Sequence, residues 1–564
     1  MKKLISLVMA TVMLITVMTT AISVSASETE TTAVGDSGTV GTINWSLDSN
    51  GTLTLSGEGY MPEFNSTNAP WCSYDLQNNV KSAIIGSGIK SIGSYAFYYN
   101  KNLTSVTFEN NSKLEKINKY SFSYTGIESI ILPSSLKSIE ERAFCYADSL
   151  SSISSNASVT LESRALSNCN NLTNVNMPKA TFGPYSLGYS SNVQTLSAGT
   201  LKEYALYDIS SLTSVNLLNA RTIGKYALYG CNNLKSVSSN ATSIGDRAFY
   251  QCSSLQTVSL PKATSIGEYA FYQLPNLTTV KLGKVQNIKQ GAFYECKKLT
   301  TVTGTSNLRT IGDYAFDLDT KLKNLSTSSR LTYIGDYSFS NCKSLTGSIN
   351  TTNVTYVGRY AFANCSSLKS TLVFKKVKTI EYEAFVNCKK IKCNSLGSKI
   401  TKLGAYSFLG CSSVKSLYIP SCCKDIGFDS LIKNVISCTV SSTGYLDVKY
   451  NRNGPKIAIY GDKGSAAQNH ANIYKNRFYY AVKKITLNKT SATVKVKKTT
   501  KIKVKAITPK NAKIKSVTFS TSNKKIATVS SKGVVKGVKK GTCYVYAKAK
   551  DGSGKISKVK IIVK

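Results

Sequence analysis

Apolar residues recur along the chain with a period of about 22 residues between Ser91 and Val435. Each period contains a step such as A-F, as in SIGSYAFYYNKNLTSVTF at 91–108 and SIGDRAFYQCSSLQTVSLP at 243–261. We call the large apolar residue of this step the anchor and number other positions relative to it. Sixteen anchors follow at separations of 19 to 25 residues: Phe97, Phe122, Phe144, Leu166, Leu187, Leu206, Leu228, Phe249, Phe271, Phe293, Phe316, Phe339, Phe362, Phe385, Phe408 and Leu431. This period predicts a solenoid whose coils bury their apolar sides against their neighbours.

The apolar positions within one coil predict two kinds of local structure. An aliphatic residue stands at −5 and a small residue at −1, as Ile244 and Ala248 do before Phe249. This i, i+4 spacing predicts a short helical turn. Leu255 and Val258, at +6 and +9, belong to an L-x-x-V-x-L run that predicts a strand. Such strands would stack in a parallel sheet at about 4.8 Å per coil.

The segments before the array predict export and a cap. Two lysines, an apolar stretch from Leu4 to Val24 and Ser25-Ala26 predict a signal peptide over 1–26, with an uncleaved anchor helix as the alternative. Residues 27–40 lack periodicity, which predicts a disordered lead-in. Residues 41–80 contain two alternating runs around a turn and predict a β cap. The solenoid itself is predicted over 81–440, with about sixteen coils.

Two further segments follow the array. Residues 441–482 are predicted to form a C-terminal cap and linker, with a strand, a turn and a short helix that begins after its N-cap Ser465. From 483 to 564 lysine alternates with apolar residues, as in KIKVKAI, and turn signals such as Asp551-Gly552 separate the runs. This pattern predicts a small β-sandwich.

The repeated phrase I-G-x-Y-A-F-x-x-C-x-x-L-x-x-V-x-L-P resembles the BspA-like leucine-rich repeat of bacterial surface proteins over about residues 80–440. The run FSTSNKKIATVSSKGVVKGVKKGT at 519–542 is similar to the bacterial Ig-like group 2 domain. The resemblance implies a leucine-rich-repeat solenoid, with a parallel β stack and short helical arms, followed by an all-β Ig-like sandwich. It also implies that the second domain serves as a stalk or binding module. Leucine anchors and irregular coil lengths between Thr160 and Tyr207 depart from the pattern, so we expect the curvature to be disturbed there.

Charge is concentrated at the C-terminal end. The formal net charge is +41, and residues 483–564 hold 24 lysines against one acid, so they carry 24 − 1 = +23. Such a domain should attract an anionic cell-wall polymer, although the lysines could instead only keep the sheet soluble. Specific nucleic-acid recognition is not expected, because interleaved aromatic and arginine side chains are missing. The candidate polyanion-binding residues are Lys495, Lys497, Lys501, Lys503, Lys505, Lys558 and Lys560.

Cysteine and histidine do not predict a metal or catalytic site. Eight of the fifteen cysteines stand at +3, and one repeated position indicates a small buried side chain rather than a metal ligand. The single histidine, His470, is expected at the surface of the capping helix and leaves no Ser-His-Asp or Cys-His arrangement elsewhere. We therefore expect no enzyme, no cofactor and no metal. The eight cysteines are Cys169, Cys231, Cys252, Cys296, Cys342, Cys365, Cys388 and Cys411.

Tyrosine is the remaining candidate for function, with 34 residues concentrated at −2 and +1. Position −2 is predicted to point outward. A row of partly exposed tyrosines would offer apolar faces and hydroxyls to a partner, or would only stack to secure adjacent coils. The candidate binding strip is Tyr95, Tyr185, Tyr204, Tyr226, Tyr269, Tyr314, Tyr337, Tyr360 and Tyr406.

Together these features predict an exported cell-surface or secreted binding or adhesion protein. Its solenoid would bind an extracellular protein or glycan, and its basic domain would act as a stalk or electrostatic tether to the cell wall. We expect a monomer without a membrane span in the mature chain. The alternatives are a wall-associated scaffold without a dedicated ligand and a carbohydrate-active module.

Overall fold

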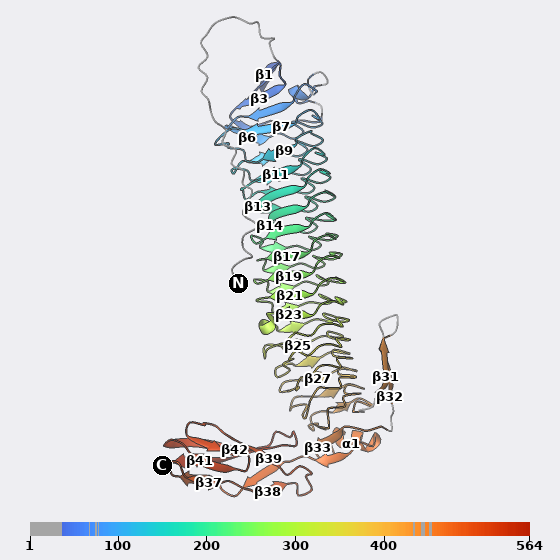
Figure 1. Ribbon diagram of the computed structural model, residues 1–564, viewed down its shortest axis with the longest axis vertical. Coiled ribbons are helices and arrows are strands. Elements are labelled where there is room, and N and C mark those ends of the chain that lie inside the picture. The colour runs from blue at the N-terminus through green and yellow to red at the C-terminus, as the bar shows by residue number, and fades with distance from the viewer. Residues whose placement is uncertain are drawn as a thin grey trace, which may run out of the picture.

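The computed structural model describes residues 36–66, 68–73, 76, 78–431 and 454–564, together with the backbone of 435–440 and 446–450. The predicted signal peptide at 1–26 and most of the predicted lead-in lie outside the described residues. The chain forms a long parallel β-solenoid that is followed by a small all-β domain (Figure 1). Both parts of the predicted fold class are thereby confirmed, except for the helical arms.

A β cap covers the first coil. Strands β1 (Ser37–Val40), β2 (Ile43–Leu47) and β3 (Thr52–Gly57) pair antiparallel, and β3 then pairs in parallel with β5 (Ser82–Ile85). The 3-10 turn η1 (Pro70–Cys72) buries Trp71. Since 37–40 pair with β2, the prediction of disorder is wrong for these residues.

The L-x-x-V-x-L runs form the first parallel ladder of the solenoid. Their apolar residues alternate with exposed polar residues, so one side of each strand faces the core. β7 (Ser105–Phe108) pairs with β5, and after a break in the pairing the ladder continues with β9 (Ser129–Ile131), β11 (Ser152–Ser154), β13 (Asn174–Phe182), β14 (Thr195–Leu201), β15 (Ser214–Leu217), β17 (Ser236–Ser239), β19 (Thr257–Leu260), β21 (Thr279–Leu282) and β23 (Thr301–Thr303).

Two-residue strands at −6 and −5 form the second ladder, which begins at β4 (Gly59–Tyr60) and β6 (Ile89–Ile92). In the shortened middle coils, β13 and β14 are long enough to belong to both ladders. The other members are β8 (Lys116–Ile117), β10 (Ser138–Ile139), β12 (Thr160–Leu161), β16 (Thr222–Ile223), β18 (Ser243–Ile244), β20 (Ser265–Ile266), β22 (Asn287–Ile288), β24 (Thr310–Ile311), β25 (Tyr333–Ile334), β26 (Tyr356–Val357), β27 (Thr379–Ile380), β28 (Lys402–Leu403) and β30 (Asp425–Ile426).

Positions −4 to +3, which we call the turn segment, form a run of turns instead of the predicted helix. Residues at −2 and +2 take positive φ, for example Tyr95 at 56° and Tyr99 at 66°. Left-handed residues of this kind interrupt a right-handed helix. The backbone N–H groups at −2, 0 and +2 donate to the next coil, as Phe97 N does to Ser121 O at 2.8 Å. The prediction of short helical arms is therefore wrong.

The core of the solenoid is a stack of anchors. Phe271, Phe293 and Phe316 are fully buried, and their ring centroids lie 5.1 and 5.2 Å apart in stacked geometry. The predicted burial of the cysteines at +3 is confirmed, because all eight have 0% exposure. Their thiols donate to the anchor carbonyl of the preceding coil, as Cys342 Sγ does to Phe316 O at 3.0 Å. The fourteen cysteines whose side chains the structure describes are free thiols.

The C-terminal cap prolongs the first ladder. Strands β29 (Ser416–Tyr418), β33 (Ala458–Gly461) and β34 (Phe478–Tyr480) pair in parallel, and the hairpin β31 (Val435–Val440) and β32 (Leu446–Tyr450) precedes β33. The helix α1 (Ala466–Ile473) begins after Ser465, whose side chain accepts a hydrogen bond from Gln468 N. The predicted strand, turn and capped helix are confirmed.

The last domain is all β. A buried apolar core that includes Val535, Val545 and Ile561 lies between its sheets. Asp551, its one acid, is buried and accepts a hydrogen bond of 2.5 Å from Val482 N at the domain boundary. The three sheets are β35 (Lys484–Leu487) with β38 (Val504–Thr508), then β36 (Ser491–Val494), β43 (Ile556–Val563), β42 (Gly541–Ala549) and β39 (Val517–Thr521), and finally β37 (Thr499–Lys501), β41 (Val534–Gly537) and β40 (Ala527–Val529).

Candidate functional site

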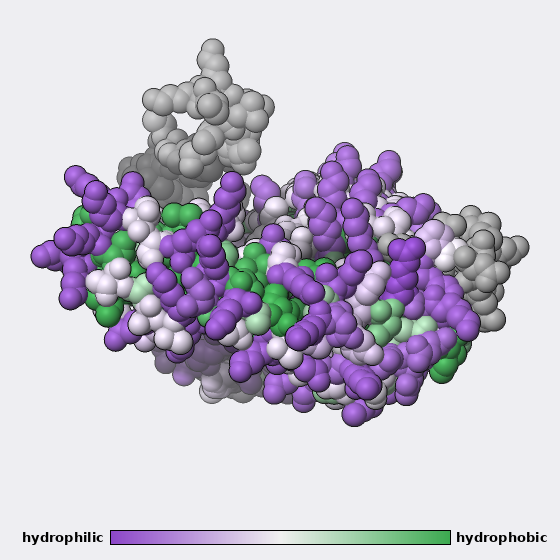
Figure 2. Space-filling model, turned by 90° about the horizontal axis from the view of Figure 1, so that it is seen from below, coloured by the Kyte–Doolittle hydropathy of each residue, from purple (hydrophilic) through white to green (hydrophobic). Residues whose placement is uncertain are grey.

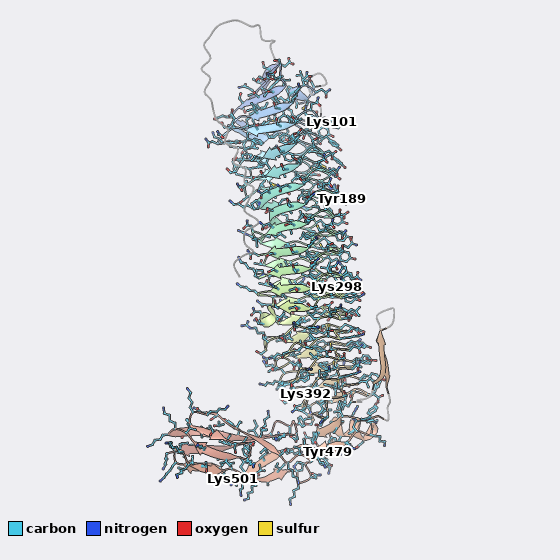
Figure 3. The ribbon with its side chains drawn as sticks, viewed as in Figure 1. Lys101, Tyr189, Lys298, Lys392, Tyr479 and Lys501 are labelled. Carbon is cyan, nitrogen blue, oxygen red and sulfur yellow. The ribbon has the colours of Figure 1, made fainter. Side chains whose placement is uncertain are left out.

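The turn segments stack into one long side of the solenoid, which we call the turn face. Tyr189, at +2 of its coil, marks this face in Figure 3. Three columns of side chains run along this face, at −2, +1 and +2. Because every coil repeats the same backbone geometry, residues at one position lie above each other at about 4.8 Å.

The predicted binding strip is the −2 column. All nine candidate tyrosines are half-buried. Tyr204 stacks on Tyr185 at 5.1 Å and on Tyr226 at 4.9 Å. A second run joins Tyr337 to Tyr314 at 4.8 Å and to Tyr360 at 4.6 Å. The structure therefore brings these six residues together in two ladders of three.

The remaining candidates of the strip are separated from these ladders. Tyr95 stacks on Tyr120, and Tyr406 meets Tyr382 edge to face. Tyr269 lies across Gly291, where an added Cβ would meet its ring at 2.3 Å. Tyr120 stands at the same −2 position, although it was not included in the candidate strip.

Arginine interrupts the −2 column, and the sequence analysis overlooked it as well. Arg142 and Arg164 follow Tyr120, and Arg247 lies between Tyr226 and Tyr269. The Arg247 guanidinium carbon lies 5.7 and 5.2 Å from the centroids of these two rings. Such cation–π contacts keep the guanidinium on the ring face and leave its N–H groups available at the surface. The repeat register identifies these residues, because arginine replaces tyrosine at −2.

The +1 column forms a second row of tyrosines in the middle of the array. Rings of Tyr229, Tyr250, Tyr272 and Tyr294 follow one another at 5.4 to 5.5 Å. Burial, followed by the charges of nearby acids, raises the pKa of Tyr294 to about 12. This hydroxyl therefore stays protonated and able to donate a hydrogen bond at neutral pH.

Buried acids replace the usual side chains in one part of the turn face. Asp317 stands at +1 below Tyr294, and Asp319 stands at +3 in the cysteine position. One carboxylate oxygen of each is buried and has no hydrogen-bond partner. Burial raises the pKa of Asp317 to about 7 and that of Asp319 well above its usual value. Burial also raises the pKa of Glu383, which stands at −2, to about 7.

All seven candidate lysines of the last domain are exposed, but they do not lie on one sheet. Lys558 and Lys560 belong to β43, Lys501 to β37 and Lys505 to β38, which are strands of three different sheets. Lys558 Nζ lies 5.0 Å from the Tyr544 ring centroid. Hydrophilic side chains dominate the surface at this end of the molecule (Figure 2). The positive charge therefore surrounds the domain instead of forming a single strip.

The structure corrects the expectation for His470. This residue is 4% exposed, and its ring centroid lies 4.5 Å from that of Tyr474. Burial lowers its pKa to about 4, so the imidazole is neutral at physiological pH. His470 is a packing residue of the cap and not a surface residue, because α1 packs against β30 and β33.

The described residues contain neither a metal-binding cluster nor a membrane-spanning helix. Among them, no group of three histidine, cysteine or acidic side chains is placed to hold a metal ion. No helix in the same part of the chain combines the length and apolar character that crossing a bilayer requires.

The coil geometry and the repeated anchors define the class of the protein as a leucine-rich repeat solenoid. Residues 72–194, 199–323, 264–392 and 344–440 match the family model of the BspA type leucine rich repeat region, and 481–559 match that of the bacterial Ig-like domain (group 2). The chain belongs to the BspA-type leucine-rich repeat family and carries a C-terminal bacterial Ig-like domain. Neither description is that of an enzyme.

Comparison with solved structures finds bacterial proteins, two of which are described as leucine-rich repeat proteins. One from Bacteroides ovatus is 19% identical, over 68% of this chain and 94% of that protein, with a TM-score of 0.38. One from Eubacterium ventriosum is 22% identical, over 57% and 92%, with a TM-score of 0.28. The pneumococcal vaccine antigen PcpA is 16% identical, over 61% and 100%, with a TM-score of 0.30. Among curated proteins none matches the chain.

Proposed function

We propose that this chain is an exported binding protein of a bacterial surface. The turn face of its solenoid captures an extracellular protein or glycan, and its basic Ig-like domain is a stalk that is also attracted to anionic cell-wall polymers. The observation that carries the proposal is the set of half-buried tyrosine columns. Each column offers fixed ring edges and hydroxyls, and a fixed ring loses little entropy on binding.

The tyrosine columns are tested by replacing Tyr226, Tyr269 and Tyr314 with serine. Binding of the purified protein to an array of glycans and matrix proteins should fall at least about tenfold, as expected when aromatic contacts of a binding surface are lost. Tyr333 and Tyr356 also stack, at 5.2 Å, but belong to the second ladder. Their replacement with serine is the matched control and should leave binding unchanged.

Unchanged capture by a folded triple variant would contradict the proposal and favour the scaffold alternative. In that case the tyrosines only hold adjacent coils together.

The lysine domain is tested by sedimentation with anionic cell walls. The protein should sediment at low salt and be released by moderate salt, because counterion-dependent attraction is screened. Changing Lys558 and Lys560 to glutamine should lower the salt concentration needed for release, whereas Lys298→Gln in the solenoid should not. Retention that does not depend on salt would contradict the electrostatic tether.

A further inference from the structure

A groove runs along the turn face near its N-terminal end. It has a volume of about 550 Å³ and spans the coils of Phe97 to Leu187. Its floor consists of small residues at +1, namely Ser123, Cys145 and Ser167. Tyr98 closes this column at one end, and Tyr207 stands at +1 beyond the other. The groove exists because tyrosine, which fills +1 in the middle of the array, is missing here.

One wall of the groove is aromatic. Tyr124 stacks on Tyr146 at 4.9 Å, and Tyr189 follows beyond Asn168 in the same +2 column. Tyr146 and Tyr189 are 39% and 48% exposed, so part of each side chain is open to solvent. Two coil steps separate them, which is about 10 Å. These rings form an apolar wall against which the ring of a ligand can pack.

The other wall is cationic. Arg142 is engaged, since it donates to the Tyr120 hydroxyl and lies 3.4 Å from Glu141 Oε1. Arg164 is exposed, and its guanidinium carbon lies 5.9 Å from the Tyr185 ring centroid. Within the described part of the chain, Arg164 forms no ion pair. Its planar N–H groups are therefore free to bind a carboxylate in a bidentate manner.

The floor offers little to an extended peptide. Tyr124 N and Tyr146 N donate to the carbonyls of Cys145 and Ser167 in the next coil. Ser123 Oγ donates to Cys145 O at 2.6 Å as well. These backbone groups are thus already bonded, whereas a peptide that adds as a strand needs free ones. Burial also raises the pKa of the Cys145 thiol, so the floor carries no thiolate.

We propose that this groove binds an acidic oligosaccharide of the uronic-acid class. Arg164 holds the sugar carboxylate, Arg142 adds positive potential, and the rings of Tyr146 and Tyr189 pack against the apolar faces of the sugar rings. The inference rests on the proposed binding role of the solenoid and names the ligand class at one place on its turn face. It differs from that proposal in the residues concerned, because none of these four belongs to the predicted tyrosine strip.

The test is titration of the purified protein with a panel of uronic-acid oligosaccharides: oligogalacturonate, oligomannuronate and hyaluronan fragments. Their methyl esters are the matched ligands, because they keep the sugar ring and lose the charge. The acids should bind at least about tenfold more tightly than the esters, which corresponds to one charge-assisted contact. Sulfated oligosaccharides form a separate arm that distinguishes carboxylate from sulfate recognition.

Arg164→Gln should weaken binding of the acids about tenfold and abolish the difference between acid and ester. Arg221 is an exposed arginine outside the groove. Its change to glutamine should alter neither the binding of the acids nor the difference between acid and ester. Tyr189→Ala should weaken the binding of acids and esters to the same extent, since ring packing does not depend on charge. Melting curves of the variants verify that each is folded.

Equal binding of acids and esters, binding of only the sulfated arm, or an unaffected Arg164→Gln variant would each overturn the inference. Failure of the whole uronic-acid panel would overturn it too. If an extracellular protein still bound through the tyrosine columns in that case, the proposed function would stand without this site.

Discussion

Asp319 Oδ1 accepts a hydrogen bond from Cys296 N at 2.7 Å, so the aspartate bonds to a residue that stands at the same position one coil earlier. In eight other coils this position is a cysteine whose thiol donates to the anchor carbonyl of the preceding coil. The aspartate instead holds a carboxylate in a fully buried place, where the charged form is costly. This coil is therefore a local weak point of the column.

Replacing Asp319 with cysteine should stabilise the solenoid. The new thiol would donate to Phe293 O as Cys342 Sγ does to Phe316 O, and Cys296 N keeps its second acceptor, Phe293 O at 3.2 Å. Removing one buried unpaired oxygen is worth about 1–3 kcal/mol. The gain in stability is measured as the melting temperature at pH 8. Asp313→Asn is the control. A lower melting temperature would contradict this account.

Asp317 should make stability depend on pH. Burial raises its pKa from 3.8 to about 7, so the folded chain holds the proton more tightly than the unfolded chain does. The resulting stabilisation is complete below about pH 4 and is lost as the pH rises through 7. Asp317→Asn should therefore stabilise the protein at pH 8, by up to about 4 kcal/mol, and have little effect at pH 4.

The measurement for Asp317 is the melting temperature of wild type and variant across this pH range. Glu268→Gln, at an exposed carboxylate, is the control and should leave the pH profile unchanged. A variant with the wild-type profile would contradict the raised pKa of Asp317 in the folded chain.

Tyr226 should tolerate glycine better than alanine. Its φ is 52°, a conformation that costs a residue with a Cβ about 1 kcal/mol or more. Both changes remove the ring contacts with Tyr204 and Tyr229, but only glycine also relieves the strain. In chemical denaturation, the free energy of unfolding of Tyr226→Ala should be about 1 kcal/mol lower than that of Tyr226→Gly. The opposite order would show that backbone freedom in the unfolded chain dominates.

The anchor stack should depend on volume more than on aromaticity. Phe293→Ala removes a fully buried ring between Phe271 and Phe316 and should cost about 3–5 kcal/mol. Phe293→Leu should cost less than half of this, because leucine is the natural anchor in other coils, such as that of Leu228. Denaturation of both variants tests this, and similar losses would indicate that ring stacking itself is decisive.

Asp551 should hold the two domains together. It accepts hydrogen bonds from Val482 N and Ser553 N, and the adjoining Gly552 packs against Asn394 and Tyr418 of the solenoid. Asp551→Ala leaves a buried N–H without its acceptor, at a cost of about 1–3 kcal/mol. Amide exchange of Val482 should become faster, whereas that of Val545 in the domain core should not. Faster exchange throughout the domain would indicate general unfolding.

The period of the sequence predicts the coils, the anchors and the burial of the cysteines, because each repeats often enough to reveal its position. The prediction of a helical arm in each coil was wrong for a physical reason. The i, i+4 spacing of Ile244 and Ala248 fits a helix, but the intervening Arg247 has φ 52°. Its N–H donates to Glu268 O of the next coil. Hydrophobic spacing does not distinguish bonds within a segment from bonds between coils.

The sequence analysis did not predict the groove, because it considered residue types that recur at the same position of the coil. Its floor consists of residues that break the tyrosine pattern at +1, and Arg142 and Arg164 break it at −2. An alignment of the coils in register exposes both departures. The depth of the groove and the engagement of Arg142 with Glu141 depend on side-chain packing, which spacing alone does not predict.

The backbone bonds between coils also determine how the molecule responds to force. In both ladders and in the turn segments they point along the axis of the rod. Tension applied between its two ends therefore loads them lengthwise, and coils detach one after another from an end instead of shearing together. Each detached coil of 22 or 23 residues releases about 75 Å of chain. A molecule stretched between a cell and its target would thus lengthen in steps and limit the load on its binding contacts.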